Sequence, residues 1–229
     1  MTKYTEMWDV IENKYKDKYA TTFENYKNSV SMRELALIGR AGYGLWQGGE
    51  LLSGALISIG KFAKVVFLMP GERQNSPTRS FIRYADSPIS FPTSDIYKPD
   101  HLILAEADML NFRSVAFDID IPQLTAKMDE RGLIIVNSSK HPSELQGLLK
   151  ARVATVDAAR IALELLKSPF HINTAMIGAY LALTNVMSME SFEHSIKTYR
   201  DPRGRMVYAG AKGDINIKAA WAGYESIRV

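Results

Sequence analysis

Short apolar runs recur along the chain, and segments with helical periodicity follow them. The runs lie at 34–39, 64–69, 78–84, 100–106, 132–139 and 151–158. The fourth and fifth are continuously apolar, which is typical of strands that are covered on both faces. In the third run, Ser80, Ile82 and Tyr84 alternate with Arg79, Phe81 and Arg83. That alternation predicts a strand with one exposed face, and it favours antiparallel pairing.

Apolar residues at steps of three and four predict helices after most of these strands. The predicted helices cover 51–59, 123–130, 158–167, 174–185, 189–200 and 214–224. Asp157, Thr174 and Ser188 stand at the start of three of them and are predicted as N-caps. The alternation of strand and helix predicts an α/β fold, namely a Rossmann-like, doubly wound, mostly parallel sheet with C-terminal helices.

The first 29 residues have a different pattern. Apolar and aromatic side chains recur at helical spacing, at Tyr4, Met7, Trp8, Ile11, Tyr15, Tyr19, Phe23 and Tyr26. This pattern predicts an amphipathic helix. Because aromatic residues are enriched at interfaces, the helix either packs on its own domain or lies on a partner subunit. We therefore divide the chain into an N-terminal helical arm, 1–29, and an α/β domain, 30–229.

Composition narrows the possible functions. The 229 residues are 46% hydrophobic, which suffices for one large domain with a core. A formal charge of +3 gives no indication of nucleic-acid binding. The sequence has neither a signal-peptide core nor an apolar stretch of ~20 residues, so we expect a cytoplasmic protein without a membrane partner. The absence of cysteine excludes disulfides, thiolate metal sites and iron–sulfur ligation within this chain.

Five glycines fall between residues 39 and 49, at the junction of the first strand and its helix. Such a loop presents backbone N–H groups and a positive helix end to an anion. The order Gly39-x-x-Gly42-x-Gly44 reverses the dinucleotide fingerprint, and the Lys-Ser/Thr pair of a P-loop is missing. NAD binding and ATP hydrolysis are therefore disfavoured. A phosphate cradle and close packing of helix on strand both stay open.

Other polar residues give weaker indications. Arg40, Arg73 or Arg79 can meet phosphates, or the arginines of this region, Arg83 included, can form surface ion pairs with Glu72. Residues at the end of the fifth strand face the crevice in which open α/β sheets bind ligands, or they make only turn and cap contacts. The four histidines lack metal-site spacing. We predict no catalytic residue and no metal ligand in this chain.

Taken in order, the motifs resemble the gamma subunit, or gamma domain, of 2-oxoacid:acceptor oxidoreductases, such as the pyruvate, 2-oxoglutarate, oxalate and phenylglyoxylate enzymes. They cover residues 32–225 and read GRAGYG, GERQNSPTRSFIRYADSPI, YKPD, GLIIVNSS, VDAARIALEL, NTAMIGAYLALT, SMESFEHSI and NIKAAWAGYE. Each motif alone is weak, but the ordered series is specific.

The resemblance implies a complex that decarboxylates a 2-oxoacid on thiamine diphosphate, passes electrons through [4Fe–4S] clusters and transfers the acyl group to coenzyme A. It implies that thiamine diphosphate, magnesium and the clusters lie on partner subunits: thiamine-binding alpha and beta subunits and a ferredoxin-like delta subunit. This chain would be a non-catalytic subunit that packs on the thiamine-binding subunits and contributes to the coenzyme A site. The alternative is a stand-alone Rossmann-like nucleotide-binding module, or an enzyme of another class.

The family's glycine loop, G-R-G-G-Q-G, falls on Gly39, Arg40, Ala41, Gly42, Tyr43 and Gly44. Its second motif falls on 71–76 and contributes Glu72, Arg73, Asn75 and Ser76. With Arg79, Asn137 and Ser138, these are the predicted coenzyme A-binding residues. Ala41, Tyr43, Asn75 and Ser76 depart from the family pattern. The departures point to altered coenzyme A contacts, or to a less common substrate branch such as phenylglyoxylate.

Overall fold

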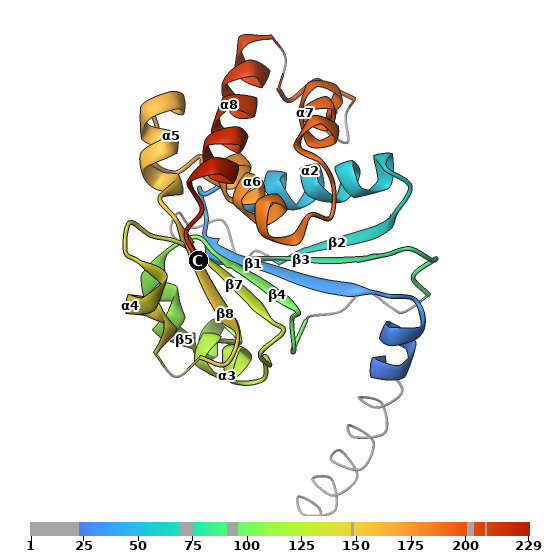
Figure 1. Cartoon of the computed structure of the whole chain (residues 1–229), viewed down its shortest axis with the longest axis vertical. Helices are drawn as coiled ribbons and strands as arrows, with labels where there is room; N and C mark the ends of the chain where they lie inside the picture. Colours follow the sequence, from blue (N-terminus) through green and yellow to red (C-terminus); the bar gives the residue numbers. More distant parts are fainter. Residues whose placement is uncertain (1–22, 69–75, 91–95, 148, 201–203, 209) are drawn as a thin grey trace, which may run out of the picture.

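The computed structural model describes residues 23–68, 76–90, 96–147, 149–200, 204–208 and 210–229. Their centre is a six-stranded mixed sheet in the order β2-β3-β1-β4-β7-β8 (Figure 1). The strands are β1 (Arg33–Arg40), β2 (Phe62–Leu68), β3 (Pro77–Ala85), β4 (His101–Leu104), β7 (Leu133–Asn137) and β8 (Arg152–Val156). β1, β4, β7 and β8 are parallel, and β3 is antiparallel to both of its neighbours. The predicted α/β fold with a mostly parallel sheet is confirmed.

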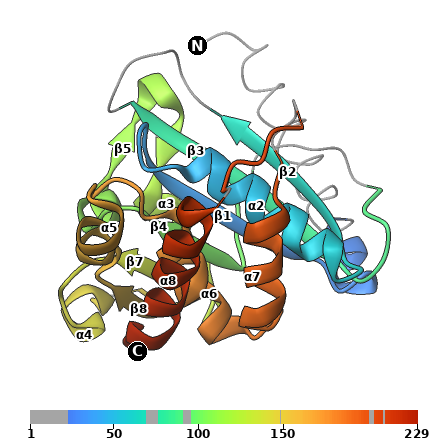
Figure 2. The same ribbon diagram turned by 90° about the horizontal axis from the view of Figure 1, so that it is seen from above.

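Helices cover both faces of this sheet (Figures 1 and 2). The first layer holds α2 (Leu45–Ser58), α5 (Ala158–Leu166), α6 (Asn173–Thr184), α7 (Met189–Thr198) and α8 (Ala211–Ser226). The second layer holds α3 (Ile121–Ala126), α4 (Pro142–Gln146), the 3₁₀ helices η1 (Ala107–Asn111) and η2 (Val115–Phe117), and the small strands β5 (Arg113–Ser114) and β6 (Ile119–Asp120). Within the described residues, no helix combines the length and apolarity that crossing a membrane requires.

The central strands contribute side chains to both layers. In β1, Leu35 and Leu37 belong to the core under α2, and Ala36 and Ile38 belong to the core on the opposite face. All four are at most 2% exposed. Burial on both faces explains why these strands read as unbroken apolar runs rather than alternating ones.

The predicted exposed face of β3 is wrong, although its antiparallel pairing is confirmed. Ser80 and Arg83 are both buried. Ser80 lies under α2, where Gly49 has no side chain to exclude it. Arg83 is buried because its guanidinium bonds the carboxylate of Glu34 on β1 at 2.8 Å. The polar residues of this strand therefore mark internal contacts and not solvent, and Arg83 is no surface ion.

Two of the three predicted N-caps are confirmed. Asp157 accepts from Arg160 N at 3.1 Å, and Ser188 accepts from Ser191 N at 3.2 Å. The prediction for Thr174 is wrong, because α6 already begins at Asn173. Thr174 is fully buried, and its hydroxyl donates to Asn216 Oδ1 on α8 at 3.2 Å. Contact between the two helices fixes this side chain, so it is unavailable as a cap.

The helix predicted at 123–130 starts earlier and is shorter than expected. Asp120 accepts from Gln123 N at 2.8 Å and Pro122 lies in the first turn, so α3 begins at Ile121. It ends at Ala126, and Met128 then enters the core.

The described end of the N-terminal arm, residues 23–29, is helical and packs on the domain. Phe23 and Tyr26 contact the small core of Met32, Ala85 and Ile89. Lys27 is buried and bonds Glu34 at 3.2 Å and Asp100 at 2.8 Å. Removing the chain up to residue 28 would therefore also remove a buried ion pair. The earlier aromatic positions, from Tyr4 to Tyr19, lie outside the described residues, and a partner contact there stays a prediction.

A chain of buried polar groups links the sheet to α6. Tyr180 Oη lies 2.8 Å from Tyr84 Oη and 3.0 Å from His101 Nδ1. Burial lowers the pKa of His101 from its ordinary value of 6.5 to about 4. The imidazole is therefore neutral in the folded protein at pH 5, where the unfolded chain binds a proton.

This depressed pKa predicts a pH-dependent stability. As pH falls from 6.5 to 4, the unfolded state takes up a proton that folded His101 does not, so the free energy of unfolding should fall by up to about 3 kcal/mol. Urea unfolding at pH 7 and pH 4.5 measures the change. His101→Gln keeps a partner for Tyr180 but does not titrate, so its pH dependence should be smaller than wild type. If the free energy of unfolding depended equally on pH in wild type and in His101→Gln, His101 would not be the group responsible.

Candidate functional site

A cavity of about 720 Å³ opens beside the carboxyl end of β1. From β1 the chain passes through α2 to β2 and β3 on one side, whereas β4 and β7 lie on the other side. The junction of β1 and β4 is therefore the topological switch point of the sheet, the usual ligand site in open α/β folds. The loop 40–44 and the starts of α2, α6 and α8 line the cavity, with the end of α5.

The glycine loop forms one wall of this cavity. Gly42 and Gly44 have positive φ angles, +107° and +73°, which favour glycine and turn the chain sharply into α2. The first bond of α2 runs from Gly48 N to Gly44 O at 2.8 Å. The N–H groups of the first turn, residues 45–47, therefore have no acceptor within the helix, and no acidic residue lies among them. This end of α2 suits an anion.

The other glycines of this stretch have mainly packing roles. A Cβ at Gly39 would overlap Ala105, and one at Gly49 would overlap Ser80. A Cβ at Gly48 would lie 3.1 Å from Asn173 Cβ. Gly54 differs, because a Cβ there meets nothing within 4 Å. Close packing thus explains the lack of a side chain at Gly39, Gly48 and Gly49, but not at Gly54. At Gly42 and Gly44 the turn itself requires glycine.

Arg40 is held by acidic residues that follow β4. Its guanidinium bonds the carboxylate of Glu106 and, at 2.9 Å, that of Asp108. Tyr43 Oη donates to the same Glu106 carboxylate at 2.6 Å. Burial and this bond raise the pKa of Tyr43, while the hydrogen bond to Asp108 raises that of Arg40. The family's loop arginine is therefore charge-balanced in this chain.

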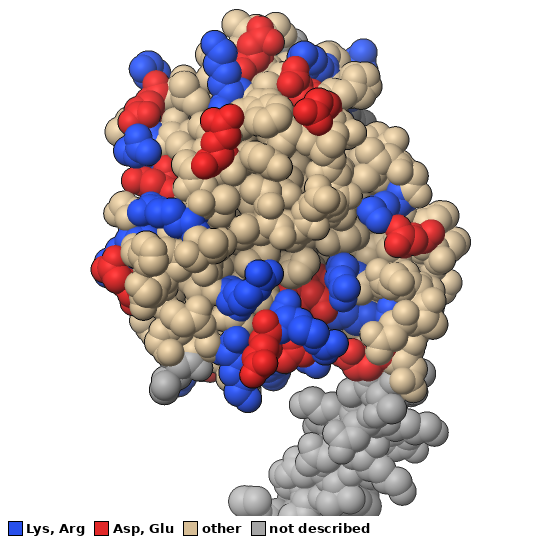
Figure 3. Space-filling model, in the orientation of Figure 1, with Lys and Arg blue, Asp and Glu red and all other residues tan. Residues whose placement is uncertain are grey.

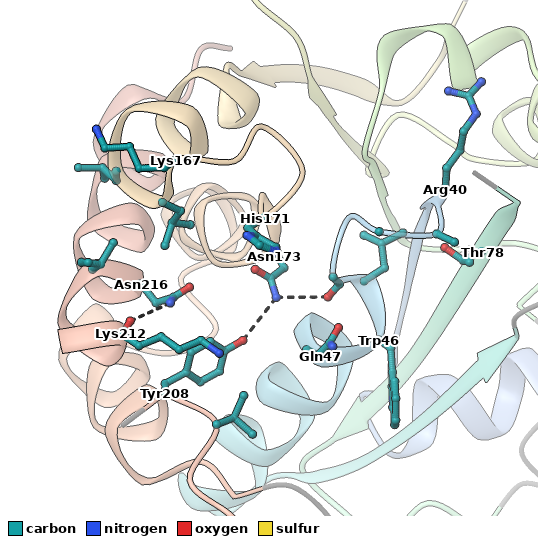
Figure 4. Close-up of a pocket in the computed structure, with 18 of the residues that line it drawn as sticks. Arg40, Trp46, Gln47, Thr78, Lys167, His171, Asn173, Tyr208, Lys212 and Asn216 are labelled. Atoms are coloured by element: carbon teal, nitrogen blue, oxygen red, sulfur yellow. Dashed lines mark hydrogen bonds between the residues drawn. The ribbon is translucent and has the colours of Figure 1, made fainter. Parts of the chain in front are cut away.

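Asn173 joins the two walls of the cavity (Figure 4). Its Nδ2 donates to Gly44 O at 3.2 Å and to Tyr208 Oη at 3.4 Å. Lys212, in the first turn of α8, places Nζ 5.7 Å from the centre of the Tyr208 ring. The glycine loop and the α8 side are thus held in fixed relation by one buried amide.

The cavity combines positive charge with apolar surface. Arg40, Lys167 and Lys212 line it, and none of the lining residues in the described part of the chain is acidic. Trp46 is 45% exposed and stacks on Phe67 with ring centres 5.9 Å apart. Exposed indoles with one free face are suited to stacking on an aromatic ligand. The cavity therefore fits a ligand with anionic groups and an aromatic ring.

The structure places the predicted residues in three groups. Gly39, Arg40, Ala41, Gly42, Tyr43 and Gly44 lie together, and Ser76 joins them because Ser76 O accepts from Ala41 N at 2.8 Å. Glu72, Arg73 and Asn75 lie outside the described residues. Arg79 does not line this cavity: it bonds the carbonyl oxygens of Asp118 at 2.8 Å and Phe117 at 3.2 Å.

Asn137 and Ser138 have structural partners. Asn137 donates to Ala105 O at 2.9 Å and accepts from Ala159 N at 3.0 Å, so it ties β4 to the start of α5. Ser138 Oγ accepts from Lys140 N at 3.1 Å, as in a turn. These contacts match the cap and turn interpretation, and neither residue lines the cavity beside the glycine loop.

The far wall of the cavity was not predicted from sequence. It contains Lys167, His171, Asn173, Tyr208 and Lys212. Only Asn173 lies in a recognised motif. The Gly-Ala-Lys-Gly run at 210–213 was the available signal for Lys212, since it opens α8 much as the first glycine loop leads into α2.

In the described residues no three metal-ligating side chains cluster. The cavity walls present cations, amides, a phenol and N–H groups, which bind and orient anions. The geometry therefore supports ligand binding.

Comparison with known proteins gives one consistent family. Residues 34–226 match the family model described as pyruvate ferredoxin/flavodoxin oxidoreductase. The pyruvate synthase subunit PorC of Methanosarcina barkeri is 33% identical over 72% of this chain and 85% of its own length. The common gamma subunit of the pyruvate/ketoisovalerate oxidoreductases of Thermococcus kodakarensis is 32% identical over 82% and 94%.

Solved structures share the fold. The pyruvate oxidoreductase subunit PORC of Thermotoga maritima superposes with a TM-score of 0.65 at 25% identity, covering 86% of this chain and 97% of its own. The 2-oxoglutarate:ferredoxin oxidoreductase of Magnetococcus marinus, solved with 2-oxoglutarate, coenzyme A and succinyl-CoA bound, superposes at 0.62 and 15% identity over 85% of this chain and 30% of its own. The resemblance drawn from the motifs is confirmed: the chain belongs to the pyruvate ferredoxin/flavodoxin oxidoreductase family, in which it takes the place of the gamma subunit.

Proposed function

We propose that this chain supplies the binding site for the nucleotide end of coenzyme A in a 2-oxoacid:ferredoxin oxidoreductase complex. The observation that carries the proposal is the 720 Å³ cavity, where the open first turn of α2 meets lysines and an exposed indole without any acidic lining residue. The diphosphate fits the N–H groups of residues 44–47. The exposed face of Trp46 fits the adenine ring.

The redox cofactors belong to other subunits in this proposal. The sequence contains no cysteine, so it offers no thiolate for a [4Fe–4S] cluster. We assign thiamine diphosphate with magnesium to alpha and beta subunits, and the clusters to a ferredoxin-like delta subunit. This chain then binds one substrate of the complex and contributes no catalytic acid, base or nucleophile.

Surface composition supports packing against such partners. Figure 3 shows charged side chains gathered over the upper helices and along the lower edge, with a broad area between them that has few charges. Near the cavity, Trp46 and Phe170 are exposed, and Phe170 makes an edge contact with Tyr43 at 5.6 Å between ring centres. Exposed aromatic residues are typical of protein interfaces.

Gly42→Val tests the coenzyme A proposal. A Cβ at Gly42 meets no protein atom within 4 Å, but φ +107° strains any residue other than glycine, so valine should distort the loop beside the first turn of α2 without disturbing the core. We expect the affinity of the complex for coenzyme A to fall about tenfold or more, the equivalent of one or two lost charge-assisted hydrogen bonds. Calorimetric titration of coenzyme A into the complex, purified through a tag on this chain, measures the change.

Gly60→Val is the matched control, because it also adds a valine in open space at a positive φ, +88°, but away from the cavity. Its affinity should equal that of wild type. An intact Gly42→Val complex whose affinity for coenzyme A is unchanged would contradict the proposal that the glycine loop binds the phosphates. Loss of assembly in that variant would instead make the loop an interface turn. A colourless monomer that binds the ligand tightly without partners would contradict the subunit assignment.

A further inference from the structure

The cavity has a second positively charged region, separate from the glycine loop (Figure 4). Arg40 and the start of α2 lie on one side of Asn173, and Lys212 with Tyr208 lies on the other. Arg40 is already bonded to Glu106 and Asp108, so it adds little net charge. In the part of the chain that the structure describes, the cavity lysines that form no ion pair, Lys167 and Lys212, are on the side of α5 and α8.

Lys212 is the best placed of these groups. Its ammonium lies 5.7 Å from the ring centre of Tyr208, and Tyr208 is buried and bonded by Asn173. A lysine above a fixed aromatic ring has a defined position. In the part of the chain that the structure describes, Lys212 forms no ion pair within 4 Å. Its charge is thus available to a ligand.

Two further groups line the same cavity. Lys167 follows α5, with φ +57°, and its Nζ donates to Glu164 O at 2.8 Å, so its ammonium is held against α5 and points away from Lys212 (Figure 4). His171 lies beside Asn173 at the start of α6 (Figure 4). A group bound here would meet donors from the loop before α6 and from the start of α8, which lie far apart in sequence.

We infer that Lys212, with His171, forms an anion subsite that takes the 3′-phosphate of coenzyme A. The inference rests on the proposed function, in which the first turn of α2 takes the diphosphate. A ligand that fills the cavity then presents a second, separate phosphate to the opposite wall. Ammonium groups are compact charges that suit a phosphate monoester. The subsite therefore distinguishes coenzyme A from its 3′-dephospho form.

Calorimetric titration of the intact complex with coenzyme A and with 3′-dephospho-coenzyme A tests this subsite. Wild type should bind coenzyme A more tightly. Lys212→Gln should weaken coenzyme A about tenfold to a hundredfold, as expected for a lost charge-assisted hydrogen bond. Its affinity for the dephospho form should stay at the wild-type value. Lys212→Arg should recover most of the preference.

Lys218→Gln is the matched control, since Lys218 is exposed on the same helix but does not line the cavity. It should bind both ligands as wild type does. Equal weakening of both ligands by Lys212→Gln, or an unchanged preference, would overturn the subsite while leaving the coenzyme A proposal standing. Failure of wild type to bind either ligand would instead overturn the proposed function.

Discussion

Replacing Glu34 with alanine is expected to lower the free energy of unfolding by about 3–5 kcal/mol. The Glu34 carboxylate accepts from Lys27 Nζ at 3.2 Å and from Arg83 Nε at 2.8 Å, and all three side chains are at most 6% exposed. Alanine removes the negative charge that both cations share, so the Glu34 carboxylate no longer offsets the desolvation of Arg83, and Lys27 is left with its ion pair to Asp100. Urea unfolding at pH 7, followed by circular dichroism, measures the loss.

Two further variants test whether the loss of stability in Glu34→Ala comes from the missing charge or from the missing side-chain volume. In the double variant Glu34→Leu, Arg83→Met, apolar side chains replace the buried pair, and Lys27 keeps Asp100 at 2.8 Å. The double variant should be more stable than Glu34→Ala alone. Asp129→Ala breaks an exposed pair with Arg131 and should change the free energy of unfolding far less than Glu34→Ala does. A double variant no more stable than Glu34→Ala would show that unpaired charge is not the cause.

The same buried network shows where sequence patterns mislead. The alternation of Arg79, Phe81 and Arg83 predicts a solvent-facing side of β3. The second layer covers Phe81 there, the end of the arm covers Arg83, and Glu34 on the neighbouring strand β1 pairs with Arg83. Alternation reports which residues share a face. It does not report whether a partner with opposite charge covers that face, because such a partner comes from a distant segment.

Local features of the sequence were sufficient to predict the strands and the glycine loop. Apolar runs mark β1, β4 and β7 because both faces of these strands are buried. The turn at Gly42 and Gly44 could be predicted from its own residues, since positive φ angles favour glycine. Matching motifs in order then identified the family.

The far wall of the cavity could not be found in this way. Asn173 lies 129 residues after Gly44, and their hydrogen bond depends on how α6 crosses α2. The neutralisation of Arg40 likewise depends on β4 lying beside β1, which brings Glu106 and Asp108 to the loop. Spacing within a motif carries no information about either contact. Tertiary packing therefore decides which of the predicted residues face a ligand.

Gly178→Ala is expected to lower the free energy of unfolding by about 3 kcal/mol, although alanine favours a helix by about 1 kcal/mol over glycine. α6 and α8 approach each other at two glycines. A Cβ at Gly178 would overlap the carbonyl of Ala220, and a Cβ at Gly223 would overlap that of Ala175. A backbone oxygen cannot change rotamer, so the helices must separate. Thermal and urea unfolding of the single variants measure the cost.

The double variant Gly178→Ala, Gly223→Ala shows whether one movement explains both losses. Because either methyl group forces the same two helices apart, the combined loss should be smaller than the sum of the single losses. Gly54→Ala should instead stabilise the chain by up to about 1 kcal/mol, because its Cβ meets nothing within 4 Å. Strictly additive losses would mean that each methyl is accommodated locally. The same separation would shift Asn173 on α6 against Lys212 on α8, so Gly178→Ala should also weaken the binding of coenzyme A in the complex.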